Sequence, residues 1–174
     1  MVYDAANQEN ILFGGFSGTV NSETWAWNGV QWTLKTTAGP SPRAAHAMAY
    51  DSIRNRVVMH GGYEASGTNG ETWEWDGASW TLRSSNGPGP RGSHALAFDS
   101  ARGVTVMFGG DDGGFNDETW EWDGNQWTFR DVNGPSGRWG HAMAYDAANG
   151  VVVLFGGSTG GHETWTWDGQ QWTF

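Results

Sequence analysis

The chain has 174 residues, of which 37% are hydrophobic, and contains 28 glycines and 13 tryptophans. This length suffices for one sizeable core, and the tryptophans supply much of its area. The absence of cysteine excludes disulfides and thiolate metal sites. The net charge of −10, without basic clusters, makes nucleic acid and anionic membranes poor candidate partners. No apolar run reaches the length of a membrane-spanning helix, so none is expected.

One cassette of residues recurs four times along the chain. Its aspartates, Asp4, Asp51, Asp99 and Asp146, are separated by 47, 48 and 47 residues. Ten residues after each aspartate begins a glycine pair: Gly14-Gly15, Gly61-Gly62, Gly109-Gly110 and Gly156-Gly157. The distance from the glycine pair to a following Glu-Thr-Trp varies between copies. Such a period predicts a repeat architecture in which the fixed stretches are paired strands and the variable one is a surface loop.

Each copy is expected to form four strands. The first is rich in small and apolar residues, as at 46–50 and 141–145. The second is a continuous apolar run, as at 57–59 and 151–155, which fits a strand buried on both faces. The third carries Trp-x-Trp, whose alternation places both indoles on one side of the sheet. The fourth begins at the last tryptophan of the copy.

An Asn-Gly or Asp-Gly dipeptide joins the third and fourth strands, at Asn28-Gly29, Asp76-Gly77, Asp123-Gly124 and Asp168-Gly169. These dipeptides favour a two-residue type I′ hairpin. That turn predicts four cross-strand indole pairs: Trp25 with Trp32, Trp73 with Trp80, Trp120 with Trp127, and Trp165 with Trp172. We expect these tryptophans and the glycine pairs to be structural, each indole pair adding about 0.5–1 kcal/mol beyond area burial.

A single four-stranded sheet cannot bury both of its apolar faces, whereas sheets stacked around an axis can, so the pattern predicts an all-β propeller. The apolar run closed by Gly-Gly, the spaced aromatic residues, and Arg-x-x-His ahead of the next unit resemble the kelch repeat, in the Trp-Asp-Gly form common in bacterial proteins. The resemblance covers residues 1–174 as one domain or half-propeller. It implies four kelch-type blades of four antiparallel strands, at approximately 1–35, 44–83, 92–130 and 139–174, and slightly favours an extracellular or periplasmic location.

The resemblance implies a ring of five to eight blades, usually closed by a strand borrowed across the termini. Here Met1 falls within an expected first strand and Phe174 within an expected fourth, so we expect no latch inside the chain. The chain is then an excised piece of a larger propeller, one half of an eight-bladed ring completed by a homodimer, or a closed four-bladed ring. We favour an open segment, completed by a second copy or excised.

Three arginines lead the first strands, each three residues before a histidine: Arg43 before His46, Arg91 before His94, and Arg138 before His141. Because both recur with the fold, we expect each arginine to pair with a repeated glutamate such as Glu71 or Glu118, and each histidine to satisfy backbone groups. The alternative is a basic ring that binds a carboxylate or sulfate, and in kelch proteins arginines at this place sometimes contact acidic peptides. Histidines from separate blades are too far apart to share a metal ion, so neither metal nor cofactor is expected.

Aromatic residues that break the repeat are the other candidate ligand contacts. Trp139 is the only tryptophan outside the periodic set, and Phe16 and Tyr63 follow glycine pairs. With Arg138 these side chains could line one surface suited to a glycan or a peptide. The alternative is that they fill gaps between blades.

No nucleophile–base pair and no glycine-rich phosphate loop emerges, so an enzyme is not expected. The kelch enzyme galactose oxidase needs a tyrosine crosslinked to cysteine, which this chain cannot form. The sequence favours a non-catalytic module for protein interaction or structural scaffolding that self-assembles through blade–blade contacts. One alternative is a fragment of a secreted carbohydrate-binding or carbohydrate-active kelch protein. Another is an engineered or repeat-derived propeller fragment with no ligand.

Overall fold

The computed structural model describes residues 1–131 and 133–174, which form four four-stranded antiparallel sheets and a small hairpin. We call the sheets blades 1 to 4. Blade 1 comprises β1 (Val2–Asp4), β2 (Glu9–Phe13), β3 (Thr24–Trp27) and β4 (Trp32–Thr36). Blade 2 comprises β5 (Ala47–Asp51), β6 (Arg56–His60), β9 (Thr72–Trp75) and β10 (Trp80–Ser84), with the hairpin β7 (Tyr63–Glu64) and β8 (Gly67–Thr68) in its variable loop. Blade 3 comprises β11 (Ala95–Asp99), β12 (Val104–Phe108), β13 (Thr119–Trp122) and β14 (Trp127–Asp131). Blade 4 comprises β15 (Ala142–Asp146), β16 (Val151–Phe155), β17 (Thr164–Trp167) and β18 (Trp172–Thr173).

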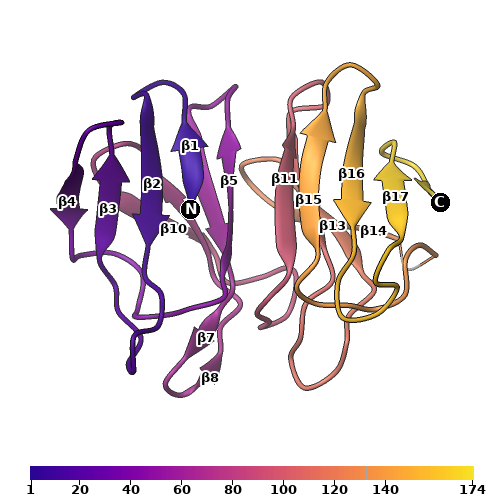
Figure 1. Cartoon of the computed structure of the whole chain (residues 1–174), viewed down its shortest axis with the longest axis horizontal. Helices are drawn as coiled ribbons and strands as arrows, with labels where there is room; N and C mark the ends of the chain where they lie inside the picture. Colours follow the sequence, from indigo (N-terminus) through magenta and orange to yellow (C-terminus); the bar gives the residue numbers. More distant parts are fainter. Residues whose placement is uncertain (132) are drawn as a thin grey trace.

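The blades stand side by side through their first strands. Strand β1 contacts β5, β5 contacts β11, and β11 contacts β15, and these strands lie together in the middle of Figure 1. Later strands of each sheet lie progressively farther out, with β4 at one side of the molecule and β17 at the other (Figure 1). This arrangement is consistent with propeller-like blades, and the prediction of four four-stranded antiparallel sheets is confirmed.

The fourth strands begin at tryptophan in every blade, as predicted, whereas the first strands begin one residue later than the sequence indicated. The second strands of blades 2 and 3 are buried on both faces, as predicted, whereas in blade 4 the predicted run 151–155 is only partly buried and Phe155 is exposed. Val57, Val58 and Met59 have no exposed surface, and neither do Val106, Met107 and Phe108. In blades 2 and 3 the second strand therefore lies within the core, covered by neighbouring blades on both faces.

Among the residues that the structure describes, the hydrophobic core consists of three clusters, each lying between two consecutive blades. We call each of these contacts a joint. In the joint between blades 1 and 2, Ile11 and Phe13 of β2 pack against Val57, Met59 and Trp80. The other two joints use the corresponding residues of the next blades. Blades 2 and 3 thus each bury one face against the preceding blade and the other against the following blade.

Every joint contains the same buried hydrogen bond. The indole nitrogen of Trp80 donates to Thr24 Oγ1 of the preceding blade at 2.8 Å. Trp127 donates to Thr72 at 2.7 Å, and Trp172 donates to Thr119 at 2.8 Å. The same indoles lie edge-on to Phe13, His60 and Phe108 of the preceding blade, with ring centroids 5.3–5.4 Å apart. The Glu-Thr-Trp threonine is therefore the acceptor that joins one blade to the next.

A second indole crosses two of the three joints. Trp122 donates to Glu74 at 3.1 Å, and Trp167 donates to Glu121 at 2.9 Å. At the first joint the position of those glutamates holds Ala26, and the buried Trp75 nitrogen has no hydrogen-bond partner among the described residues. Packing against its neighbours therefore holds the Trp75 indole without a hydrogen bond from its ring nitrogen to any described residue.

The predicted indole pairs are wrong in register. Trp27, not Trp25, lies opposite Trp32, and Trp25 lies opposite Leu34. The observed pairs are Trp27 with Trp32, Trp75 with Trp80, Trp122 with Trp127, and Trp167 with Trp172, all with ring centroids 5.5–5.6 Å apart.

The turn explains this shift of register. Asn28 Oδ1 accepts hydrogen bonds from the backbone of Val30 and Gln31. The connection is therefore a four-residue loop closed by an asparagine side chain. Only Gly29 takes a positive φ there, of 93°, whereas a type I′ turn requires two such residues.

Replacement of Thr72 by valine tests the hydrogen bond at the joint. Thr72→Val keeps the side-chain shape but leaves the Trp127 indole N–H buried without an acceptor and removes the hydrogen bond between Thr72 and His60 Nδ1, so we expect a loss of about 1–3 kcal/mol in unfolding free energy. The matched control is Thr164→Val, which changes the same motif position on an exposed face of blade 4 and should cost less than about 0.5 kcal/mol. Denaturant unfolding of the dilute chain measures both, and equal losses would contradict this role.

Candidate functional site

The outer face of blade 4 is exposed although it carries the residues that every other blade buries. Phe155 is 53% exposed, whereas Phe13 and Phe108 at the same position are 1% and 0% exposed. Thr164 is also exposed, whereas its counterparts in the other blades are buried and accept an indole N–H. We call this surface, with Ala142 and Ala144, the blade 4 end face.

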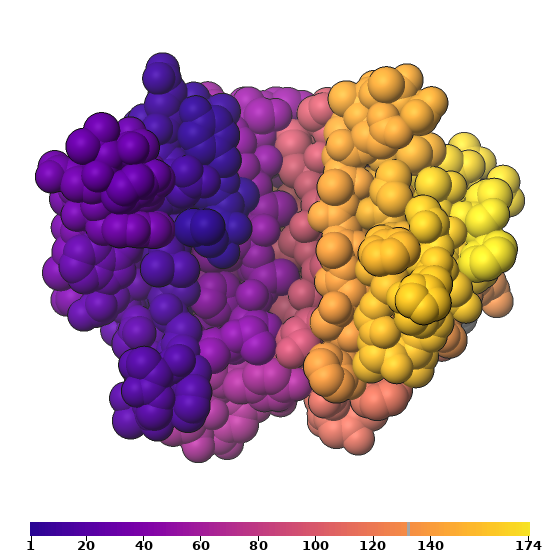
Figure 2. All heavy atoms as spheres, viewed as in Figure 1, coloured from indigo at the N-terminus to yellow at the C-terminus, as the bar shows by residue number. Residues whose placement is uncertain are grey.

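Blade 1 exposes the other half of a joint, the face that carries the tryptophans. Trp32 is 44% exposed, whereas Trp80, Trp127 and Trp172 are 8%, 9% and 7% exposed. Trp27 and Leu12 beside it are half-buried, while the matching residues of blades 2, 3 and 4 are buried. We call this surface the blade 1 end face. In Figure 2, blades 1 and 4 lie toward the viewer on the two sides of the molecule, and the surface between them is recessed.

The three arginines predicted as ligand contacts are buried in ion pairs within their own blades. Arg43 donates to Glu71 at 2.8 Å, Arg91 to Glu118 at 2.6 Å, and Arg138 to Glu163 at 2.7 Å. Their side chains are 0%, 3% and 0% exposed. The interpretation that each arginine pairs with a repeated glutamate therefore matches the geometry, and the guanidinium groups are buried.

These ion pairs perturb two of the glutamates. Burial acts to raise the pKa of Glu71, but hydrogen bonds from Arg43 and Trp73 outweigh it, and the net pKa is lowered. For Glu163 the hydrogen bond from Arg138 is the leading cause of a lowered pKa. Both carboxylates are thus anionic structural partners.

The histidines that follow the arginines lie inside the joints. His46 packs edge-on against Phe13, His94 against His60, and His141 against Phe108, with ring centroids 5.3–5.6 Å apart. Neither ring nitrogen of His94 has a hydrogen-bond partner among the described residues, so the prediction that this histidine satisfies a backbone group is wrong. Burial is the first cause that lowers the pKa of His46 and His60 to about 3 and that of His141 to about 4. Burial also lowers the pKa of His94 well below its ordinary value.

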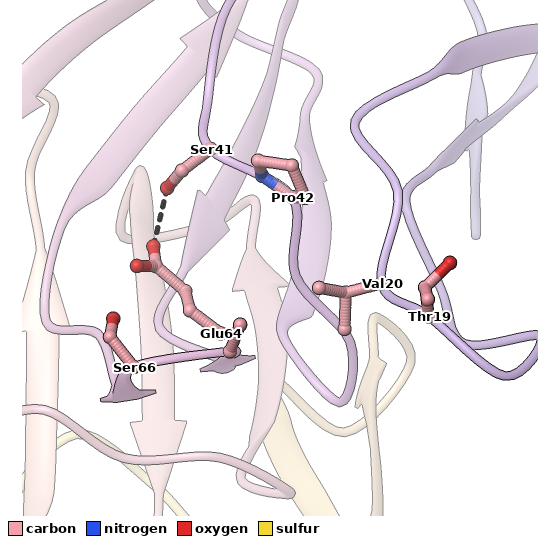
Figure 3. A pocket seen from close by; sticks show the side chains of 7 residues that line it. Thr19, Val20, Ser41, Pro42, Glu64 and Ser66 are labelled. Atoms are coloured by element: carbon pink, nitrogen blue, oxygen red, sulfur yellow. Dashed lines mark hydrogen bonds between the residues drawn. The ribbon is translucent and has the colours of Figure 1, made fainter.

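A groove opens between the 16–20 loop of blade 1 and the β7–β8 hairpin of blade 2. It contains two adjoining depressions of about 390 and 470 Å³. Phe16, which is 72% exposed, and Tyr63 line the larger depression with Ala44 and Val20. Figure 3 shows the smaller one, where the Ser41 hydroxyl donates to Glu64 and Val20 lies on the other side. Glu64 also accepts from Asn69 and pairs with Arg43, which fixes the hairpin.

The structure thus brings only two of the predicted aromatic contacts together. Phe16 and Tyr63 share the groove, whereas Trp139 is not among its lining residues. Trp139 is 41% exposed, and its backbone pairs with Ser158 of blade 4. The equivalent positions, Ala44 and Gly92, form antiparallel backbone bridges with Tyr63 and Asp111, whereas the Trp139 N–H donates to the Ser158 hydroxyl.

Sequence reasoning missed Glu64, Thr19 and Val20 in the groove, and it missed the indole-accepting role of Glu74 and Glu121. A signal for the latter exists. The residue between the two tryptophans is glutamate in copies two and three, but alanine and threonine in copies one and four.

Within residues 1–131 and 133–174, no group of three or more histidine, aspartate or glutamate side chains is placed to hold a metal ion. In the same part of the chain no helix is both long and apolar enough to cross a membrane. Neither a protein-family model nor a curated protein matches this chain.

Replacement of His60 by phenylalanine tests the buried histidines. Because their pKa values are lower in the folded chain than in the unfolded chain, the unfolded chain binds more protons, and stability falls as pH drops below about 6.5. His60→Phe introduces the phenylalanine found at the equivalent positions 13 and 108, and it removes one buried histidine whose pKa is lowered by folding. We expect the loss of unfolding free energy between pH 5.5 and 4.5 to shrink by about 1.4 kcal/mol.

Urea titrations across this pH range measure that slope. The exposed His162 provides a matched control, because His162→Ala removes a ring that water solvates in both states. An unchanged slope in His60→Phe would show that the buried ring does not oppose protonation.

Proposed function

We propose that the chain is a non-catalytic kelch-type propeller module that serves as a structural scaffold and assembles through its end faces. The single observation that supports this most is the pairing of two exposed faces, since the blade 1 end face carries the tryptophans of a joint and the blade 4 end face carries their acceptors. A second copy offers each face the surface that it already meets three times inside the chain.

The geometry of the internal joints specifies the contacts between copies. Trp32 of one copy would donate its indole N–H to Thr164 of the other and lie edge-on to Phe155, as Trp80 does with Thr24 and Phe13. Trp27 would meet Thr166, which replaces the glutamate acceptors of the inner joints. This contact is head-to-tail, so a two-fold axis through the centre of an eight-bladed ring would satisfy both pairs of end faces.

The mass of the chain in solution tests the proposal. We expect a species of about 38 kDa, twice the 18.9 kDa of one chain. Phe155→Asp should return the chain to its monomeric mass, because it places an unpaired charge in the joint. The control Phe16→Asp changes an exposed phenylalanine in the groove and should leave the mass doubled. Light scattering that finds a monomer at every concentration would contradict assembly.

A ligand-binding role for the loop end is the second candidate, favoured by the apolar groove beside Phe16 and Tyr63. A flat aromatic ring beside polar groups suits a sugar or a peptide side chain. Screening of the chain against glycans and peptides tests this role. Binding that Phe16→Ala abolishes and Trp139→Ala retains would place the ligand in the groove, and binding unaffected by Phe16→Ala would exclude it.

A further inference from the structure

Three blades hold a guanidinium group between a glutamate carboxylate and a glycine carbonyl, and blade 2 adds an asparagine acceptor. In blade 2, Arg43 donates to Glu71 Oε2 at 2.8 Å, to the Gly61 carbonyl at 3.2 Å and to Asn69 Oδ1 at 3.0 Å. In blade 3, Arg91 donates to Glu118 and to the Gly109 carbonyl. In blade 4, Arg138 donates to Glu163 and to the Gly156 carbonyl. The arrangement is a guanidinium site built by the Gly-Gly turn and the Glu-Thr-Trp motif.

Blade 1 contains the same acceptors in the same local geometry. Trp25 donates its indole N–H to Glu23 Oε2 at 2.8 Å, as Trp73 does to Glu71 at 2.9 Å. Asn21 Oδ1 accepts from the Glu23 backbone, as Asn69 does from Glu71. The Gly14 backbone donates to the Glu23 carbonyl at 3.0 Å, as Gly61 does to Glu71 at 3.1 Å. The carboxylate of Glu23 is therefore oriented like its three counterparts.

No arginine among the described residues pairs with Glu23. The three arginines of the motif are each bound to their own blade. Glu23, Asn21 and the Gly14 carbonyl thus form a site, which we call the blade 1 cradle, whose ligand type is shown by its three occupied counterparts. A carboxylate combined with fixed carbonyl acceptors suits the planar, multiply donating guanidinium better than the point charge of lysine.

We propose that the blade 1 cradle binds an arginine carried by an extended peptide segment. The three internal arginines show how such a segment lies. The side chain of each binds its own blade, and its backbone binds the preceding blade. While the Arg43 side chain enters blade 2, its backbone N–H donates to the Asn21 carbonyl of blade 1 and its carbonyl accepts from Gly15. A segment in the blade 1 cradle would use its backbone on the preceding blade in the same way. Under the proposed ring that blade is blade 4 of a second copy, so assembly would strengthen binding, although the cradle alone does not depend on the ring.

A peptide with the sequence of residues 39–47 tests the cradle, because it carries Arg43 in its native context. It is added to the whole chain labelled with ¹⁵N, and the indole N–H resonance of Trp25 is followed, since that group shares Glu23 Oε2 with the ligand. The comparison peptide has lysine in place of arginine. Glu23→Gln removes the charge while keeping an acceptor for Trp25. As the matched control, Glu9→Gln removes a half-buried carboxylate of the same blade that is paired with Lys35.

We expect the arginine peptide to shift the Trp25 resonance saturably and to bind about tenfold more tightly than the lysine peptide. Glu23→Gln should abolish the shift, and Glu9→Gln should retain it. Equal binding of the two peptides, a shift that persists in Glu23→Gln, or no shift at millimolar peptide would overturn the proposal. The same titration on Phe155→Asp separates the two proposals, because binding to this variant supports the cradle whether or not the ring forms.

Discussion

The hydrogen bond between an indole N–H and the threonine of the preceding blade is the contact on which the architecture depends. Each indole donor and its threonine acceptor are buried, so neither can exchange its partner for water. An unmade bond of this kind costs about 1–3 kcal/mol. Because the donor starts the fourth strand of one blade and the acceptor starts the third strand of another, the bond fixes both the spacing and the order of the blades.

This dependence makes every blade incomplete by itself. A blade offers tryptophans on one side and their acceptors on the other, so a row of blades always ends in one face of each kind. In this chain the exposed Trp32 and Phe155 mark those two faces. The proposed self-assembly and the proposed arginine cradle both come from comparing equivalent positions in the four blades. A contact that three blades make shows what the same position in the remaining blade can bind.

Much of the fold could be predicted from the sequence because each position of the repeat occurs in four copies that can be compared. The apolar runs before the glycine pairs identified the buried second strands, and recurrence in register identified arginine and glutamate as ion-pair partners. The register of the indole pairs could not be predicted from the Asn-Gly dipeptide, since the Asn28 side chain closes a longer loop by accepting backbone hydrogen bonds. The prediction for His94 failed for another reason. Its ring is buried against His60 of a different blade, a contact that no local pattern encodes.

Hydrogen exchange of individual indole N–H groups tests the joint most directly. In the monomeric chain, we expect Trp80, Trp127 and Trp172 to exchange only on global unfolding, because each is buried and bonded to threonine. The half-exposed Trp32, at the same position in blade 1, should exchange rapidly. Equal protection of all four indoles in the monomer, or rapid exchange at the three joints, would show that the indole–threonine bonds do not hold the blades together.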